Sequence, residues 1–250
     1  MKAVHFVLQG KGGVGKSYIA SLLAQFINQI EFQAHCYDTD PVNTTFSKYK
    51  KLGVEVVNIL TEHQSIDASK FDSLIEKIIE KDGVSVIDNG AATFIPLMQY
   101  LRENDVVGLL EESGVDVNIH VPITSGQASK DTLTGLITVL QQLNTHVIVW
   151  QNNYWGNVEL DGKEFLDWKV YQDNVEQIVG VIQLENLNPD TFGKDIKQMT
   201  SEHLTFDEVM QSSNYTLMPK QRLKRVQRDV FNQLAQQTIF VRQESLGGLG

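Results

Sequence analysis

Eight consecutive residues near the start of the chain have the types and spacing of a phosphate-binding loop. They read Gly10-Lys11-Gly12-Gly13-Val14-Gly15-Lys16-Ser17 and fit the pattern G-x-x-x-x-G-K-[ST]. Glycines let successive backbone N–H groups turn toward a phosphate, because no Cβ stands in the way. Lys16 adds a positive charge at the β- and γ-phosphates, and the Ser17 hydroxyl can ligate Mg²⁺. The segment therefore predicts a site for a nucleoside triphosphate with Mg²⁺.

The residues on either side of this loop predict the setting that it needs. Residues 3–9 form a short apolar run rich in β-formers, as expected of a strand in a parallel sheet. Beyond Ser17, apolar residues recur with helical spacing at positions 19, 22, 23, 26 and 27. A helix that begins here directs its free N–H groups and its dipole toward a bound anion. The alternative, a glycine-rich turn with no ligand, is disfavoured because the whole pattern matches in the right setting.

Acidic residues end two further strand-like runs. Asp38-Thr39-Asp40-Pro41 closes one run, and Asp88 closes the run at 84–88. In an open parallel sheet, ligands bind at the carboxyl ends of the strands. An aspartate at such an end can also be a helix N-cap or a turn residue, and this alternative stays open for Asp38 and Asp40. Beside a phosphate loop, a strand-terminal aspartate holds Mg²⁺ or a water of its shell.

Strand-like and helix-like segments alternate along most of the chain. This alternation predicts an α/β fold with a mostly parallel central sheet and helices on both faces. After residue 184 the pattern changes to helices alone, and we expect a single domain over 1–242 with a flexible tail at 243–250. The expected strands are 3–9, 33–38, 54–59, 83–88, 115–122, 145–151 and 178–184. The expected helices are 16–30, 68–81, 95–112, 126–143, 162–176, 190–202, 205–212 and 219–237.

The composition excludes several functional classes. A single cysteine, Cys36, cannot supply a disulfide, a zinc cluster or an Fe–S ligand set from one chain, and it fits a cytoplasmic protein. The net charge of −10 argues against a surface that binds nucleic acid over its whole extent. No apolar run reaches the ~20 residues that span a bilayer. The first strand runs straight into the loop, so we read the N-terminus as mature sequence.

The loop carries a second lysine, Lys11, and thereby resembles the deviant Walker A motif of the MinD/ParA group of P-loop ATPases. Asp38-Thr39-Asp40-Pro41 resembles the D-x-D-P element of ParA proteins, and Asp88 stands where their Walker B acid would be. More narrowly, the chain resembles the TraL/StbB proteins of conjugative plasmids. The stretches that carry this resemblance are VLQGKGGVGKS at 7–17, DTDPVNTTFSKYK at 38–50, VIDNGAATFIPL at 86–97, VWQNNYWG at 149–156 and QRLKRVQRDVF at 221–231.

The resemblance implies an ATPase that works as a nucleotide-sandwich homodimer with ATP and Mg²⁺. Lys11 would reach the phosphates bound by the partner subunit, Lys16 would hold the β- and γ-phosphates, and Asp40 would orient the attacking water. Ser17, Asp38 and Asp88 would hold Mg²⁺ or its waters. Asn152 would hydrogen-bond the adenine edge. The nucleotide-binding set that follows is Gly10, Lys11, Gly12, Gly13, Val14, Gly15, Lys16, Ser17, Tyr18 and Asn152.

The chain departs from ParA proteins at two places. Their Walker B acid is usually followed by prolines, whereas Asp88 is followed by Asn89-Gly90-Ala91, so the switch segment 89–97 is expected to move differently. Many ParA proteins also carry an N-terminal DNA-binding extension. Since this chain starts at the first strand, we expect no operator binding by such a domain.

A basic helix is expected at 219–228 in an otherwise acidic chain. Its candidate contacts for DNA or a partner protein are Lys220, Lys224, Arg225 and Arg228. Three interpretations stay open: an ordinary surface helix docked on the sheet, non-specific binding of DNA phosphates, and a protein-partner surface. Membrane targeting is the least favoured, because residues 232–244 are glutamine-rich and weakly amphipathic.

Together these features predict a slow ATPase switch of conjugative plasmid transfer, plasmid stability or positioning, with DNA or a plasmid-encoded DNA-binding protein as partner. One alternative is a metabolic P-loop enzyme such as a dethiobiotin-synthetase-like ligase, which would need catalytic residues for a small molecule near the γ-phosphate. Another is a nucleotide-binding module without turnover. ATP hydrolysis without any metabolite favours the switch.

Overall fold

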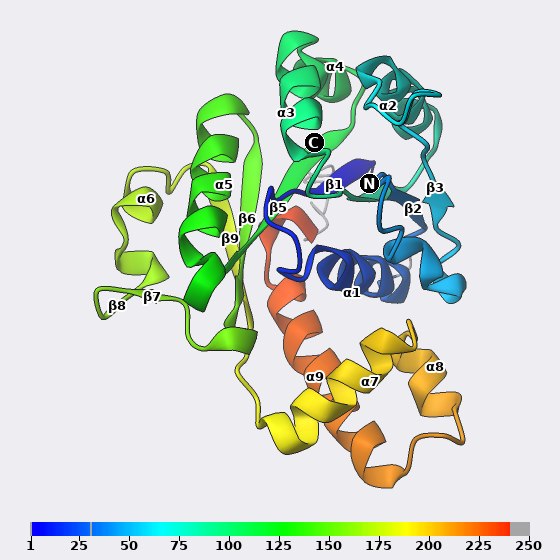
Figure 1. Cartoon of the computed structure of the whole chain (residues 1–250), viewed down its shortest axis with the longest axis vertical. Helices are drawn as coiled ribbons and strands as arrows, with labels where there is room; N and C mark the ends of the chain where they lie inside the picture. Colours follow the sequence, from blue (N-terminus) through cyan, green and yellow to red (C-terminus); the bar gives the residue numbers. More distant parts are fainter. Residues whose placement is uncertain (1, 31, 241–250) are drawn as a thin grey trace, which may run out of the picture.

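The computed structural model describes residues 2–30 and 32–240, and its centre is a parallel β-sheet (Figure 1). Seven strands lie in the order β3-β2-β4-β1-β5-β6-β9, and each pairs in parallel with its neighbours. Parallel strands buried on both faces are read as near-continuous apolar runs, which is what β1 and β4 show. The strands are β1 (Ala3–Val7), β2 (Ala34–Asp38), β3 (Glu55–Val56), β4 (Val84–Asp88), β5 (Asp116–Thr124), β6 (His146–Asn152) and β9 (Ile178–Leu184).

Helices cover both faces of this sheet, as the alternating pattern predicts (Figure 1). One face packs against α2 (Phe71–Glu80), α3 (Phe94–Glu103), α4 (Val106–Glu112) and α5 (Ser129–Gln142). The other packs against α1 (Lys16–Gln29), α7 (Lys194–Ser201), α8 (Phe206–Gln211) and α9 (Leu217–Ala235). Helix α2 shows the sequence origin of this layering, because its apolar residues at 71, 74, 75 and 78 form one buried stripe.

Two predicted helices are wrong in the same physical way, because a local backbone turn interrupts them. The helix expected at 95–112 is two helices, α3 and α4, which meet at Asp105 with φ of 47°. The helix expected at 162–176 is replaced by short elements: the strand β8 (Lys163–Glu164), which pairs with β7 (Glu159–Leu160) in a hairpin, a 3-10 turn at Phe165–Asp167, and the four-residue helix α6 (Lys169–Gln172). Asp161 and Gly162 both have positive φ, as a two-residue hairpin turn requires. The predicted tail at 243–250 lies outside the described residues.

A row of buried aromatic rings crosses the sheet from β6 to β1. The indole N–H of Trp150 donates to Nδ1 of His120 at 2.9 Å, and Nε2 of His120 lies 2.8 Å from Nδ1 of His5. Since an indole can only donate, His120 must carry its proton on Nε2 and His5 must carry its own on Nε2. Burial lowers the pKa of His5 to about 3, and it lowers the pKa of His120 well below its usual value.

These shifts predict that both imidazoles stay neutral in the folded protein down to about pH 5. Nitrogen-detected NMR should find Nε2 protonated and Nδ1 unprotonated in both rings between pH 8 and pH 5. Because the unfolded chain binds these protons below about pH 6.5, each ring removes up to about 1.4 kcal/mol of stability per pH unit as the pH falls. A doubly protonated ring above pH 5 would contradict this assignment.

Candidate functional site

The glycine-rich segment forms a loop between the end of β1 and the start of α1. Gly13 and Gly15 have φ of 75° and 98°, a backbone region that side chains with a Cβ rarely adopt. Helix α1 begins at Lys16, directly after Gly15, and Gly15 makes no side-chain cap. The first turn of α1 therefore supplies backbone N–H groups at the end of the loop, as an anion site requires.

Lys16 is held inside the loop. Its Nζ donates to the backbone carbonyl of Lys11 at 3.0 Å, and only 8% of the residue is exposed. Burial lowers the pKa of this ammonium, while the carboxylates of Asp88 and Asp40 oppose the shift. A cation buried between a loop carbonyl and two acids is positioned for an anionic ligand that enters the loop.

Asp88 supplies the neighbouring negative charge. It ends β4 and is buried, and within the described residues its Oδ1 has no hydrogen-bond partner. Burial raises the pKa of this carboxyl to about 7, against a hydrogen bond from Ser17 that lowers it. The described residues hold no cluster of three or more acidic, histidine or cysteine side chains that could cage a metal alone. A Mg²⁺ ion fits the pair Ser17 and Asp88, with phosphate and water as its other ligands.

The two other aspartates are tied to the backbone of their own segment. Both oxygens of Asp38 accept backbone N–H groups, from Asp40 at 3.1 Å and from Ser47 at 3.0 Å. Burial raises the pKa of Asp38. Asp40 accepts from the N–H groups of Val42 and Asn43, each at 2.9 Å. The turn role left open for these residues is thus present, and it holds both carboxylates at the end of β2.

A buried polar network that the sequence did not reveal joins the segments after β2 and β4. Oδ1 of Asn89 accepts from the hydroxyls of Thr39 at 3.1 Å and Thr93 at 2.8 Å. The amide of Asn89 donates to the carbonyl of Gly90 at 3.0 Å, and all three side chains are fully buried. The network lies in the stretch Asn89-Gly90-Ala91 and links the segment after Asp38 to the segment after Asp88.

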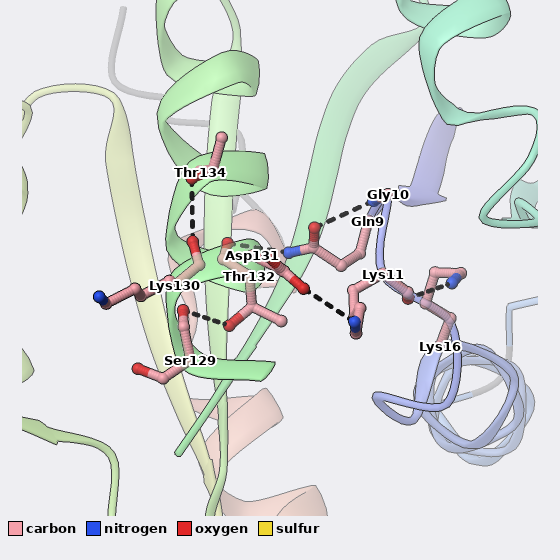
Figure 2. Close-up of polar contacts among 9 residues, drawn as sticks. All are labelled: Gln9, Gly10, Lys11, Lys16, Ser129, Lys130, Asp131, Thr132 and Thr134. Carbon is pink, nitrogen blue, oxygen red and sulfur yellow. Dashed lines mark hydrogen bonds and ion pairs between the residues drawn. The ribbon is translucent and has the colours of Figure 1, made fainter. Parts of the chain in front are cut away.

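A second connection joins the phosphate loop to the first turn of α5 (Figure 2). Nζ of Lys11 lies 2.8 Å from Oδ2 of Asp131 in the same chain. The buried side chain of Gln9 donates to the carbonyls of Pro122 and Thr132 and accepts from the N–H of Gly10. Asp131 and Gln9 were missed because nothing in the sequence places α5 beside the loop.

Asn152 braces the loop from the end of β6. Its Nδ2 donates to the carbonyl of Val14 at 3.0 Å, and its Oδ1 accepts from the N–H of Tyr154 at 3.2 Å. A Cβ at Gly15 would lie 2.9 Å from the same Nδ2, so this glycine also permits the close approach. Beside Asn152 lies a mostly apolar cavity of about 260 Å³, which Tyr18, Tyr154 and Leu184 help to line.

The loop, Asp38, Asp88 and Asn152 thus lie together at the carboxyl ends of the parallel strands. The basic residues of α9 are not part of this group. None of Lys220, Lys224, Arg225 and Arg228 lines the cavity beside Asn152. Arg225 and Arg228 both lie 3.6 Å from carboxylate oxygens of Asp229, and Arg225 also lies over the ring of Phe192. Part of this charge is therefore compensated on the surface of the helix itself.

Comparison with known proteins decides the family. A protein TraL of Escherichia coli is 43% identical over 236 residues, which are 94% of this chain and 98% of the relative. A second Escherichia coli protein TraL is 41% identical over 242 residues, which are 96% of this chain and 100% of the relative. The chain belongs to the TraL family. No protein-family model matches it.

A solved structure shows which fold this TraL-family protein has. The cell division ATPase MinD of Pyrococcus furiosus superposes with a TM-score of 0.55 at 14% identity, over 93% of this chain and 99% of MinD. The predicted α/β fold of the MinD/ParA type is therefore confirmed. In the described residues, no helix combines the length and the apolar character needed to cross a bilayer.

The close packing of the Gln9 side chain against α5 makes its contribution to stability testable. A Cβ at Gly135 in α5 would clash with Oε1 of Gln9, and the three hydrogen bonds of the Gln9 side chain prevent it from moving aside. Although alanine favours helices, we expect Gly135→Ala to lower the free energy of unfolding by about 1–3 kcal/mol, because overpacking and lost hydrogen bonds outweigh propensity.

Urea denaturation measures this effect, and Gly193→Ala is the matched control. There a Cβ would meet neighbours only at 3.7 Å, which is ordinary contact. We expect the control to change stability by less than about 0.5 kcal/mol. Equal stability of the two variants would show that Gln9 is not fixed.

Proposed function

We propose that this TraL-family protein is a Mg²⁺-dependent ATPase switch that dimerises on binding ATP and acts in the cytoplasm in conjugative plasmid transfer, plasmid stability or positioning. The observation that carries the proposal is the buried charge pair at the loop. Lys16 begins α1 directly after the loop, and Asp88 ends β4, the strand that pairs with β1. The charge of each opposes the pKa shift that burial causes in the other. A cation and a metal-binding acid at one loop are what triphosphate recognition needs.

The chain's own residues divide the work of binding. The N–H groups of Gly12 to Ser17 surround the phosphates, and Lys16 exchanges the carbonyl of Lys11 for phosphate oxygens. Ser17 and Asp88 hold the metal or its waters, and Asp38 fixes the segment that carries Asp40. Asp40 orients the attacking water. Bound Mg²⁺ neutralises charge that develops on the β- and γ-phosphates.

The cavity beside Asn152 is the proposed site of the base. It opens next to Tyr18, which follows the loop, and its apolar wall suits a flat ring. Asn152 uses one amide hydrogen on Val14 and accepts one hydrogen bond from Tyr154. An amide has two hydrogens and two lone pairs, so one of each is left for the adenine edge.

Lys11 has two alternative partners in this scheme. In the single chain it pairs with Asp131, and both side chains are about half exposed. Such an ion pair contributes only about 0–1 kcal/mol, so Lys11 can leave it at small cost. In the dimer, Lys11 reaches the phosphates bound by the other subunit, where a cation lowers the barrier to phosphoryl transfer.

The proposed partners beyond the homodimer are non-specific DNA or a plasmid-encoded DNA-binding protein. Lys224 is exposed on α9 and Lys220, one turn earlier, is half-buried, so Lys224 is the more accessible of the two to phosphates. Arg225 and Arg228 share Asp229, so their contribution to an anion site is reduced. This surface would bind DNA weakly and with a steep salt dependence.

The division of labour between the two lysines gives the decisive test. We expect Lys16→Ala to weaken Mg²⁺-ATP binding at least about 100-fold, because it removes the charge at the phosphates. Lys11→Ala should leave affinity within about threefold and lower hydrolysis at least about 100-fold. Calorimetry measures binding, phosphate release without any metabolite measures hydrolysis, and sizing with ATP, ADP or no nucleotide measures dimerisation. Equal loss of affinity in both variants would refute the proposal.

The ion pair with Asp131 makes a second test possible. Asp131→Asn removes the competing partner of Lys11 in both subunits, so the ATP-bound dimer should form up to about 30-fold more tightly, because each exposed pair contributes about 0–1 kcal/mol. Asp173→Asn is the matched control, since it breaks an exposed ion pair with Lys169 on α6. The dimer dissociation constant from analytical ultracentrifugation decides, and identical constants for both variants would contradict the competition.

A further inference from the structure

At Gln183, the outer edge of β9 is hydrogen-bonded by the side-chain amide of Gln233 in the way that a neighbouring strand would bond it. β9 ends the sheet order, so no strand among the described residues pairs with its outer side. At Gln183, the backbone N–H donates to Oε1 of Gln233 at 2.8 Å, and the backbone carbonyl accepts from Nε2 of Gln233 at 3.0 Å. One amide of α9 thus makes the two hydrogen bonds that a neighbouring strand would make.

The direction of the Gln183 backbone groups also shows where the backbone groups of Val181 point. Because backbone groups in a strand alternate in direction, the N–H and carbonyl of Val181 point from the same edge as those of Gln183. An exposed edge with outward N–H and carbonyl groups is a template for a further strand. Among residues 2–30 and 32–240, only the Gln233 side chain hydrogen-bonds to this edge at Gln183, so β9 offers a backbone site for a further strand.

A groove of about 430 Å³ runs along this edge, between the β7–β8 hairpin and α9. Three carboxylates line it, on Glu159, Glu164 and Glu185, and no lysine or arginine does so. All three glutamates are exposed, and none forms an ion pair within the described residues. The groove therefore has an uncompensated negative charge.

Amide and apolar side chains make up the rest of the groove. Gln236 and Gln237, just beyond the end of α9, extend the amide row of Gln233, and Gln237 packs over Gly180 of β9. Val181 and Leu166 add apolar surface, and Leu166 is 47% exposed. Alternating side chains of an added strand would meet apolar surface and carboxylates in turn.

We propose that this groove binds an extended basic peptide segment of a partner protein, which adds to the edge of β9 as a further strand. The segment takes over the hydrogen bonds of Gln183 from Gln233 and pairs with Val181. Its lysines or arginines face Glu159, Glu164 and Glu185, and its apolar residues face Val181 and Leu166. The proposal does not rest on the proposed ATPase activity, because the peptide binds to the chain without nucleotide.

The docked segment lies next to the cavity beside Asn152. Gln183, Glu185 and Gln233 line both the groove and that cavity. Displacement of Gln233 by a peptide therefore changes a wall of the cavity, which gives a partner direct physical access to a site next to Tyr18 and Asn152.

The test uses fluorescent ten-residue synthetic peptides and the full chain without nucleotide. The probe alternates lysine or arginine with valine or threonine. One control peptide replaces the cations with glutamate, and another keeps the charges but carries two prolines that prevent strand pairing. Fluorescence anisotropy should show the probe binding at least about tenfold more tightly than either control, because both charge and backbone pairing are required. The backbone amide NMR signals of Val181 and Gln183 should shift with the probe.

Protein variants distinguish binding in this groove from non-specific attraction to the negative charge of the protein. Glu159→Gln/Glu164→Gln/Glu185→Gln should weaken binding at least about tenfold, and Gln233→Ala should strengthen it about threefold because it frees Gln183. The control Glu62→Gln/Glu80→Gln/Glu112→Gln makes the same charge change at exposed positions outside the groove. Equal binding of the proline peptide, equal loss in the two triple variants, or a self-associated chain that covers β9 without peptide would each overturn the proposal.

Discussion

The parallel register of β1, β2 and β4 is the constraint on which the site depends. Val7 lies opposite Asp88, and Asp38 lies opposite Asp88 on the other side. This alignment brings two buried carboxylates to the point where the chain leaves β1 for the loop. A shift of one residue in either pair would turn an aspartate to the opposite face of the sheet and away from its present neighbours. Charge on Asp88 is stabilised by the nearby ammonium of Lys16, and Asp38 accepts hydrogen bonds from two backbone N–H groups.

That same constraint explains how much of the site could be predicted from the sequence. Apolar runs with a terminal acid predicted β2 and β4 within one residue, and the parallel sheet then placed Asp38 and Asp88 together. Spacing also predicted the loop and the start of α1. These features are local, and each depends on the residue types within about ten positions.

The features that the sequence did not reveal depend on contacts between distant segments. Gln9 meets Thr132 across 123 positions of sequence, and Asn89 meets Thr39 across 50. No periodic pattern encodes such pairs, because a polar side chain that is satisfied in the core looks like one that is exposed. The hairpin at 159–164 is a different case. Its Asp161-Gly162 turn was readable, but the aromatic residues that follow gave a misleading helical spacing.

The ring chain from Trp150 through His120 to His5 has a consequence for how this family can diverge. Because the indole fixes the direction of both hydrogen bonds in this row of rings, the three side chains form one hydrogen-bonded unit. Replacing His120 with an apolar residue leaves the indole N–H of Trp150 without an acceptor and Nδ1 of His5 without a donor. All three residues are fully buried, so water does not take over these hydrogen bonds. In related proteins, substitutions at these three positions should therefore occur together, and a substitution at only one of them should be rare.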